Sequence, residues 1–296
     1  MSDGFVTRSG FVALVGRPNA GKSTLLNRLV GAKLSITSRK PQTTRHRIVG
    51  ILTEPGRQFV FVDTPGFQTR HRTRLNDRLN RAVQEGVSDV DVVVWVVDAT
   101  HLVEADRAVA ALVPERMPLV VAVNKVDMLA DKTRLLPLLA QLGALREHAA
   151  IVPISAEKGT QLDALKDEIA RRLPQGGPIY AADELTDRDE RFLAAEFVRE
   201  KIFRLVGEEV PYATTVTIDR FEQEGDLRRI FASVLVDRAS QRAILLGERG
   251  ERMKRISMEA RRDLEQLLDA PVYLEVWVRV KKGWADDDAS LTRLGY

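Results

Sequence analysis

The strongest constraint on how this chain can fold is a loop near its N-terminus. The loop fits the pattern G-x-x-x-x-G-K-[ST] and consists of Gly16, Arg17, Pro18, Asn19, Ala20, Gly21, Lys22 and Ser23. An apolar run at residues 11–15 precedes it, and a helical pattern at 23–30 follows it. In this setting the glycines let backbone N–H groups approach a phosphate, and the helix N-terminus adds a favourable dipole. The loop therefore predicts a polyphosphate site, with Lys22 reaching the β- and γ-phosphates and Ser23 binding Mg²⁺.

The residues up to 176 alternate between strand and helix patterns. Strands are expected at 11–15, 47–53, 58–62, 91–97, 118–123 and 150–154, and helices at 23–30, 77–87, 104–113, 132–142 and 161–173. Continuous β-branched runs such as Val92 to Val97 indicate strands buried on both faces, which is typical of parallel sheets. We therefore expect an α/β domain with a doubly wound, mostly parallel sheet over residues 1–176.

A second, smaller α+β domain is expected over residues 177–296. The proline- and glycine-rich stretch from Pro174 to Pro178 ends the alternation and marks the boundary. The pattern beyond it is α-β-β-α-α-β, with helices at 188–206, 240–246 and 251–268 and strands at 213–221, 228–236 and 272–281. Thr186 is expected to cap the first of these helices, and Asp286 to Asp288 are expected to form a solvated tail.

Three further motifs follow predicted strands and decide which nucleotide is bound. They are Asp63, Thr64, Pro65 and Gly66, then Asn124, Lys125, Val126 and Asp127, and finally Ser155 and Ala156. The carboxylate of Asp63 can face Mg²⁺ and the N–H of Gly66 the γ-phosphate. A carboxylate at Asp127 can accept hydrogen bonds from both N1–H and the 2-amino group of guanine, and adenine lacks that pair of donors. We therefore predict GTP and GDP as ligands, and the alternative of an ATP-dependent metabolic kinase conflicts with Asp127.

This set of motifs resembles the Ras-like GTPases. The resemblance makes Arg39 to His46 the first switch, in which one of Thr43 or Thr44 binds Mg²⁺ and the γ-phosphate; the sequence does not choose between them. The second switch would run from Asp63 into Phe67 and beyond. Ras-like enzymes place a water-orienting Gln where this chain has Phe67, so we expect slow hydrolysis and name no side chain as the base.

The groups that the resemblance makes catalytic are Lys22, Asn19, Thr43, Thr44 and Gly66. In related GTPases without the Gln, an Asn in the phosphate loop helps to bind K⁺, and Asn19 holds that position. The expected reaction is Mg²⁺-dependent, K⁺-stimulated hydrolysis of GTP to GDP and phosphate.

The topology of the second domain resembles a type II KH domain. Such domains clamp about four nucleotides of single-stranded RNA on a Gly-x-x-Gly loop. From Arg242 to Arg262 there are seven basic and three acidic residues, whereas residues 178–296 as a whole have a net charge of −4 and residues 1–177 one of +7. The candidate RNA-binding residues are Gly247, Glu248, Arg249, Gly250, Arg252, Lys254 and Arg255. Glu248 departs from the pattern, because RNA-binding KH loops usually carry a basic residue there.

Residues 8–285 together resemble the Era family of bacterial GTPases. The resemblance implies binding to the 3′ end of 16S ribosomal RNA and a role in its processing and in assembly of the 30S subunit. It also implies a cytoplasmic monomer, and it leaves open a peripheral contact with the inner membrane. The alternative is a GTPase whose C-terminal domain binds a protein or membrane surface, with Gly247 to Gly250 merely a turn. The absence of cysteine excludes disulfides and thiolate metal sites.

Overall fold

The structure is a computed structural model that describes residues 7–38, 40, 43–66, 79, 89–146, 149–207, 209–285 and 287–294. These residues form two compact units. The first takes in the described chain up to Ser35 and from Thr44 to Asp187, beyond the boundary expected at 176. The second takes in Ile36–Thr43 and the chain from Arg188 onward. The helix predicted at 77–87 and the side chain of Phe67 lie outside the described residues, except that Leu79 is helical.

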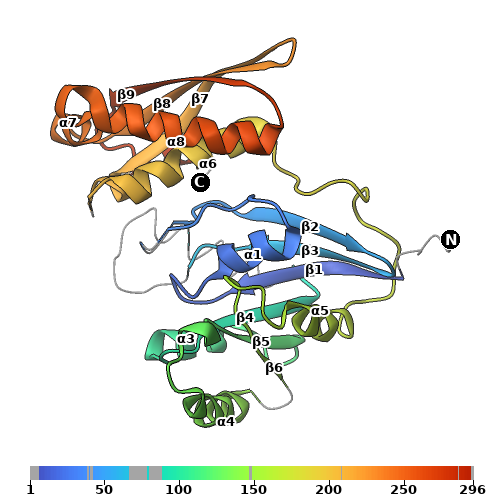
Figure 1. Ribbon diagram of the computed structural model, residues 1–296. Coiled ribbons are helices and arrows are strands. Elements are labelled where there is room, and N and C mark those ends of the chain that lie inside the picture. The colour runs from blue at the N-terminus through green and yellow to red at the C-terminus, as the bar shows by residue number, and fades with distance from the viewer. Residues whose placement is uncertain are drawn as a thin grey trace. The chain divides into compact units, whose positions relative to one another are not determined.

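A six-stranded sheet organises the first unit (Figure 1). Its strands are β1 (Arg8–Val15), β2 (Ile48–Glu54), β3 (Arg57–Asp63), β4 (Val92–Asp98), β5 (Leu119–Asn124) and β6 (Ala150–Pro153). The helices are α1 (Lys22–Val30), α3 (Glu104–Leu112), α4 (Leu135–Leu145) and α5 (Leu162–Ala170). The strand order is β2-β3-β1-β4-β5-β6, and every neighbouring pair is parallel except β2 and β3. The prediction of a doubly wound, mostly parallel sheet is confirmed.

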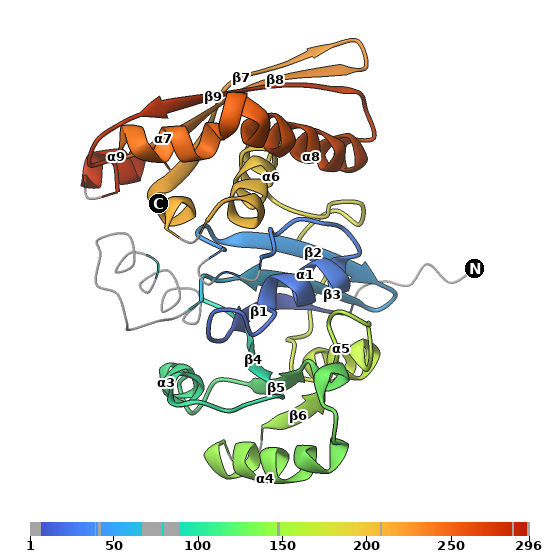
Figure 2. The ribbon, with the colours of Figure 1, turned by 60° about the vertical axis from the view of Figure 1, so that its left-hand side comes forward.

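Apolar side chains on both faces of the central strands build the core of this unit. Val93, Trp95 and Val97 of β4 pack with buried residues of α3 and α4. Figures 1 and 2 show α1 and α5 together on the other face. Because the sheet is covered on both sides, its polar loops gather at the strand ends. The carboxyl ends of the parallel strands share one edge, which is where ligands bind in open α/β sheets.

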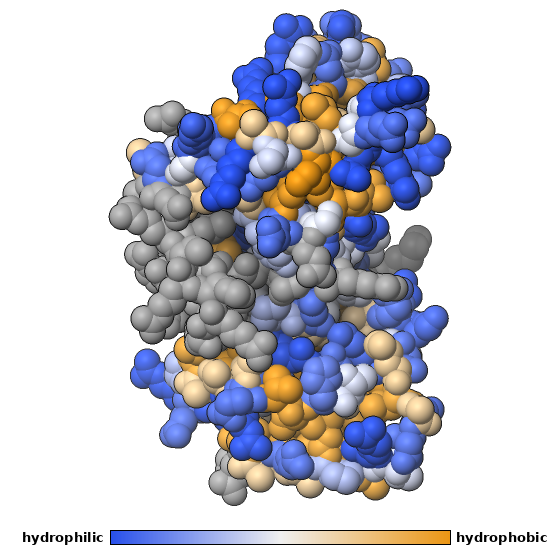
Figure 3. Space-filling view, turned by 90° about the vertical axis from the view of Figure 1, so that its left-hand side faces the viewer, coloured by the Kyte–Doolittle hydropathy of each residue, from blue (hydrophilic) through white to orange (hydrophobic). Residues whose placement is uncertain are grey.

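Some apolar side chains of the first unit reach the surface. Helix α4 contains no charged residue, and Leu136 is 72% exposed. Figure 3, which shows the left-hand side of Figure 1, has hydrophobic residues among hydrophilic ones on that face. Within the described ranges, no helix is long and apolar enough to span a membrane.

The second unit is a three-stranded sheet with helices on one face. It contains α6 (Glu190–Leu205), β7 (Thr214–Glu224), β8 (Leu227–Val236), α7 (Ala239–Leu246), α8 (Glu251–Leu268), β9 (Val272–Val280) and α9 (Asp288–Arg293). Strand β8 pairs antiparallel with β7 and parallel with β9. Val234 and Ala232 of β8 pack against Val198 of α6 and Ile256 of α8. This is the predicted α-β-β-α-α-β order, and α9 is an additional helix at the end.

Two predictions about the second half of the chain are wrong. Helix α6 is capped by Asp189, whose carboxylate accepts from the Phe192 N–H at 2.8 Å. Thr186 instead donates its hydroxyl to the Val49 carbonyl at 2.6 Å within the first unit. Where it is described, the tail after β9 is folded, because Asp287 caps α9 and Trp284 is fully buried; Asp286 lies outside the described residues. Asp is a favoured residue at a helix start, because its side-chain oxygen accepts a hydrogen bond from a free N–H group in the first turn.

Candidate functional site

The phosphate loop lies between β1 and α1, at the carboxyl edge of the sheet. Gly21 precedes α1 with a φ of +102°, a conformation that favours glycine. A Cβ at Gly16 would lie 2.5 Å from the Val96 carbonyl oxygen, and a Cβ at Gly21 would lie 2.2 Å from the side-chain nitrogen of Asn124. Both glycines therefore allow an approach of the backbone that no other residue permits, as the motif predicts.

Lys22 closes over this loop from the first turn of α1. Its Nζ donates to the carbonyl oxygens of Gly16 at 3.0 Å and Arg17 at 3.2 Å. Burial lowers the pKa of Lys22 to about 8, although the nearby carboxylate of Asp63 acts in the opposite direction. A negatively charged phosphate beside this buried ammonium would stabilise its charged form.

Hydroxyl groups converge on the carboxylate of Asp63 at the end of β3. Its Oδ2 accepts from the hydroxyls of Ser23 at 2.7 Å, Ser35 at 2.7 Å and Thr44 at 3.5 Å. Burial raises the pKa of Asp63. Its Oδ1 is buried and has no hydrogen-bond partner among the described residues. An unsatisfied carboxylate oxygen together with the hydroxyls of Ser23 and Thr44 makes the hard-oxygen donor set that Mg²⁺ prefers, so the residues present fit the ion.

The two candidate threonines of the first switch point to different groups. Thr44 lies 2.8 Å from the Ser23 hydroxyl, inside the Asp63 cluster. Thr43 donates to the Lys40 carbonyl at 2.8 Å and lies 2.9 Å from the Ser38 hydroxyl. The structure therefore brings Thr44 to the cluster and not Thr43. Both residues are buried, and nothing in the sequence around them separates the two.

Ser35 is a member of this cluster that the sequence did not reveal. The side chain of Asn27 in α1 positions it, accepting from the N–H groups of Leu34 at 2.9 Å and Ser35 at 2.8 Å. Its amide group also donates to the Ser35 carbonyl at 2.6 Å. Seven and eight residues separate these partners, which matches no helix or turn pattern.

Asn124 ties three of the predicted motifs together at the end of β5. Its amide nitrogen donates to the Ala20 carbonyl of the phosphate loop at 2.9 Å. Its amide oxygen accepts from the Ala156 N–H at 2.9 Å. Lys125, with a φ of +68°, donates to the Asn19 carbonyl at 2.7 Å. The loops that follow β1, β5 and β6 are thereby fixed to one another.

Asp127 is exposed and lies in the short helix η1, Val126–Met128. Ser155 is fully buried, and its hydroxyl accepts from the Lys158 N–H at 3.1 Å. Gly66 approaches the phosphate loop so closely that a Cβ there would lie 2.9 Å from Pro18. All four predicted motifs therefore lie at the carboxyl edge of the sheet.

Asp98 and Asp106 are two further acidic residues at this edge. Asp98 ends β4 and accepts from Lys125 Nζ at 2.7 Å. Arg17 of the phosphate loop lies 3.4 Å from Asp98 and 3.2 Å from Asp106. The position of Asp98 directly after a predicted strand was a usable signal, whereas nothing in the sequence pointed to Asp106.

The Gly-x-x-Gly loop of the second unit joins α7 to α8. Gly247 and Gly250 have φ values of +72° and +81°, and Arg249 between them has +48°. A Cβ at Gly247 would lie 2.7 Å from the Cβ of Arg252. Glu248 and Arg249 are exposed at the tip of the loop. Such a tight, glycine-dependent loop leaves backbone N–H groups accessible to a phosphate.

Helix α8 exposes basic side chains next to this loop. Met253 and Ile256 face the core, and Lys254 and Arg255 face solvent. Arg255 pairs with Glu259 at 2.8 Å, and Arg252 donates to the Ile244 carbonyl. The residues predicted to bind RNA are therefore adjacent; the two glycines are partly exposed and the charged residues are exposed.

Thr37, just before the first switch, and Lys40 within it belong to the second compact unit. The N–H of Thr37 donates to the buried carboxylate of Glu200 at 2.9 Å, and Arg204 donates to the Thr37 carbonyl at 3.0 Å. Lys40 donates to the Val206 carbonyl. These contacts link residues more than 160 positions apart, so sequence patterns could not reveal them.

The fold and the two sites together define a P-loop GTPase that carries a KH domain. Residues 11–125 match the family model described as 50S ribosome-binding GTPase, and residues 209–285 match that of the KH domain. The chain belongs to the Era family of GTPases, because it matches proteins named GTPase Era over nearly its full length. It is 51% identical to that of Nitrosomonas eutropha and 54% to that of Bordetella avium, each over 98% of both chains.

Two solved structures agree with this assignment. A variant of Aquifex aeolicus Era bound to GDP·AlF₄⁻ matches with a TM-score of 0.94 at 36% identity, over 98% of this chain and 99% of the other. Era in complex with MgGDPNP and nucleotides 1506–1542 of 16S ribosomal RNA matches with a TM-score of 0.94 at 37% identity, over the same shares.

Proposed function

We propose that this protein is a Mg²⁺-dependent GTP switch that binds the 3′ region of 16S ribosomal RNA and acts in RNA processing and 30S subunit assembly. The observation that supports it most is the cluster of Ser23, Thr44 and Asp63, in which one buried carboxylate oxygen has no hydrogen-bond partner among the described residues. The RNA assignment is supported by the accessible Gly-x-x-Gly loop and by the relative solved with 16S ribosomal RNA.

The contacts described above support the roles proposed for residues of the G domain. The backbone of the phosphate loop and the ammonium of Lys22 hold the phosphates. Ser23, Thr44 and Asp63 would hold Mg²⁺, and the ion would supply positive charge against the phosphates. The N–H of Gly66 faces the γ-phosphate, and Asn124 braces the loops around the base. Asp127, exposed on η1, accepts from the guanine edge.

The substitution Asp127→Asn tests the base assignment. An amide donor suits the extra carbonyl of xanthine, while the lost carboxylate no longer accepts from the guanine 2-amino group. The variant should therefore bind XTP better than GTP in a competition assay. Asp131→Asn, a matched change at an exposed carboxylate that caps the next short helix, should leave the preference for GTP intact. An unchanged preference in Asp127→Asn would remove this residue from the base pocket.

A K⁺ ion bound with help from Asn19 is part of the proposal. Basal turnover should be slow, near ~10⁻³ s⁻¹, as in unassisted switch GTPases. Replacing Na⁺ by K⁺ should raise the rate, and Asn19→Ala should abolish the rise. Equal rates in both salts would exclude the K⁺ assignment and leave the GTPase assignment standing.

The proposed setting is the cytoplasm, where the protein acts as a monomer with any contact to the inner membrane peripheral. The competing function, a C-terminal domain that docks on a protein or membrane surface in place of RNA, is separated by crosslinking. RNA crosslinked at residues 247–255 supports the RNA function. Crosslinks confined to protein or lipid at that segment overturn it.

A further inference from the structure

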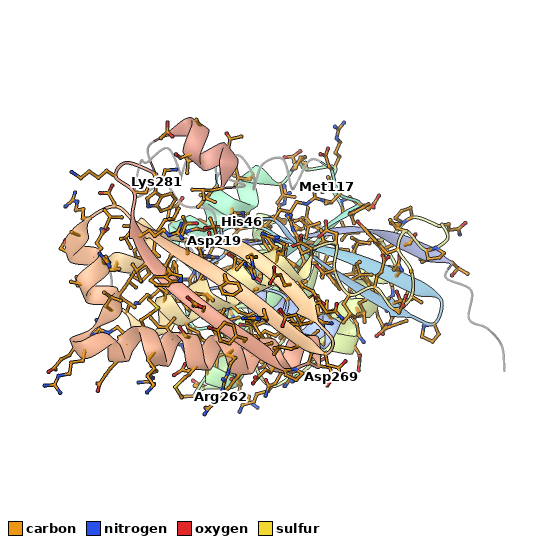
Figure 4. The ribbon with its side chains drawn as sticks, turned by 90° about the horizontal axis from the view of Figure 1, so that it is seen from above. His46, Met117, Asp219, Arg262, Asp269 and Lys281 are labelled. Atoms are coloured by element: carbon orange, nitrogen blue, oxygen red, sulfur yellow. The ribbon has the colours of Figure 1, made fainter. Side chains whose placement is uncertain are left out.

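The sheet of the second unit has one face that no described helix covers. Core residues of β8 and β9 alternate with residues that point to the other side, and Figure 4 looks onto that side. The register pairs Arg229 with Tyr273, Phe231 with Glu275 and Ser233 with Trp277 across the two strands. We call this surface the open sheet face, and its charged and aromatic side chains include Asp219, Arg220, Glu222, Glu224, Arg229, Phe231, Tyr273, Glu275, Trp277 and Arg279.

Aromatic rings on the open sheet face are unusually accessible. Trp277 is 57% exposed and Tyr273 is 43% exposed. The other two tryptophans of the chain, Trp95 and Trp284, are fully buried. Large aromatic rings left in water are enriched at binding surfaces, because they bury much area with little loss of conformational freedom.

The open sheet face has one more carboxylate than it has arginines to pair with. Its three arginines each pair within the face, since Arg220 lies 2.7 Å from Glu222, Arg229 lies 3.1 Å from Glu224, and Arg279 lies 3.3 Å from Asp219. The fourth carboxylate, Glu275, has no ion-pair partner in the described part of the chain. The net charge of these three arginines and four carboxylates is therefore −1, whereas the stretch from Arg242 to Arg262 is basic.

The leftover carboxylate is held between the two exposed rings. The Tyr273 hydroxyl donates to Glu275 Oε2 at 2.9 Å, and the Trp277 indole N–H donates to Oε1 at 2.8 Å. Arg229 already stacks over Tyr273, 5.5 Å from the ring centroid. Such a carboxylate fixed beside an indole ring can pair with one cation and offer it the ring face as well.

We propose that the open sheet face is a docking site for a basic segment of a partner protein, with an arginine or lysine side chain seated on Glu275 and Trp277. Charge complementarity selects this occupant. A nucleic acid would bring phosphates to a face whose only unpaired charge, among its described side chains, is negative, and it finds basic residues around the Gly-x-x-Gly loop instead. The inference concerns a different surface from the RNA site and stands whether or not RNA binds.

The test uses the full-length protein and a fluorescein-labelled peptide of six Gly-Arg repeats, measured by fluorescence anisotropy. Glu275→Gln removes the charge and keeps one carbonyl oxygen that can accept from the Trp277 N–H, while the Tyr273 hydroxyl can turn to accept from the new amide N–H group. It should weaken peptide binding about fivefold or more, as expected for loss of an ion pair that a cation–π contact reinforces. Glu259→Gln, the same change on α8, should leave the affinity within about twofold of wild type.

A second measurement locates the peptide. Because Trp277 is the accessible tryptophan, acrylamide should quench its fluorescence, and the unlabelled peptide should protect it. A peptide of Gly-Gln repeats should not protect. The proposal is overturned if wild type does not bind the arginine peptide, if the two variants lose affinity equally, or if dodecauridylate protects Trp277 in place of the peptide.

Discussion

Replacing Asn124 by alanine should damage both the stability of the first unit and its hold on the nucleotide. The side chain is buried and makes two hydrogen bonds of 2.9 Å, to the Ala20 carbonyl and from the Ala156 N–H. Alanine leaves both backbone groups buried without their partner, and each costs about 1–3 kcal/mol. A total of about 3 kcal/mol corresponds to a fall in Tm of roughly 6–12 °C for a domain of this size. Thermal unfolding followed by circular dichroism measures it.

Gln58→Ala is the matched control for this prediction. Gln58 is equally buried and makes four hydrogen bonds, among them one from the Ile179 N–H at 2.7 Å and one to the Tyr180 carbonyl at 2.9 Å. It lies at the opposite end of β3 from Asp63. Both variants should lose stability, but only Asn124→Ala should weaken GDP binding, by about tenfold or more in calorimetry. Equal GDP affinity in the two folded variants would refute the bracing role of Asn124.

Three further outcomes are expected. Because burial lowers the pKa of Lys22 to about 8, the unfolded chain binds more protons than the folded one above pH 8. In nucleotide- and Mg²⁺-free protein the stability of wild type relative to Lys22→Met should therefore rise by roughly 2–3 kcal/mol from about pH 8 to about 10.5 in urea titrations. A flat difference contradicts this. Glu248→Lys should tighten binding of single-stranded RNA and steepen the salt slope of log K by roughly 0.7, since it adds one phosphate contact; a wild-type slope in the folded variant speaks against RNA on this loop. Asp287→Ala should lower the stability of the second unit by about 1 kcal/mol through loss of the α9 cap, measured by urea unfolding, and an unchanged midpoint would make the cap irrelevant.

The sheet of the first unit could be predicted because its strands are continuous apolar runs closed by polar residues. Val92 to Val97 is buried on both faces, as a parallel sheet covered on both sides requires of its central strands. The motif loops then follow by position, since each comes directly after a strand. The same logic extends to Asp98, which the sequence placed correctly but which no motif singled out.

Other parts of the site depend on contacts between residues distant in sequence. The choice between Thr43 and Thr44 depends on which hydroxyl reaches Asp63, and the two are neighbours with the same chemistry. Glu200 binds Thr37 across 163 positions, and periodicity carries no information about such a pair. The cap predicted at Thr186 was wrong for a different reason. Thr186 is a good capping residue, but its hydroxyl donates to the Val49 carbonyl instead.

The strand order of the first unit also links nucleotide supply to folding. Strand β1 pairs with β3 and β4, and β5 with β6, so the loops around the nucleotide come together only when segments across the whole unit have found their parallel partners. Such non-local pairing forms slowly, and no fragment of the unit presents the complete site. A ligand that binds only the native state raises its stability with the logarithm of the ligand concentration. The amount of folded protein should therefore follow the guanine nucleotide pool, and a starved cell should degrade this protein faster.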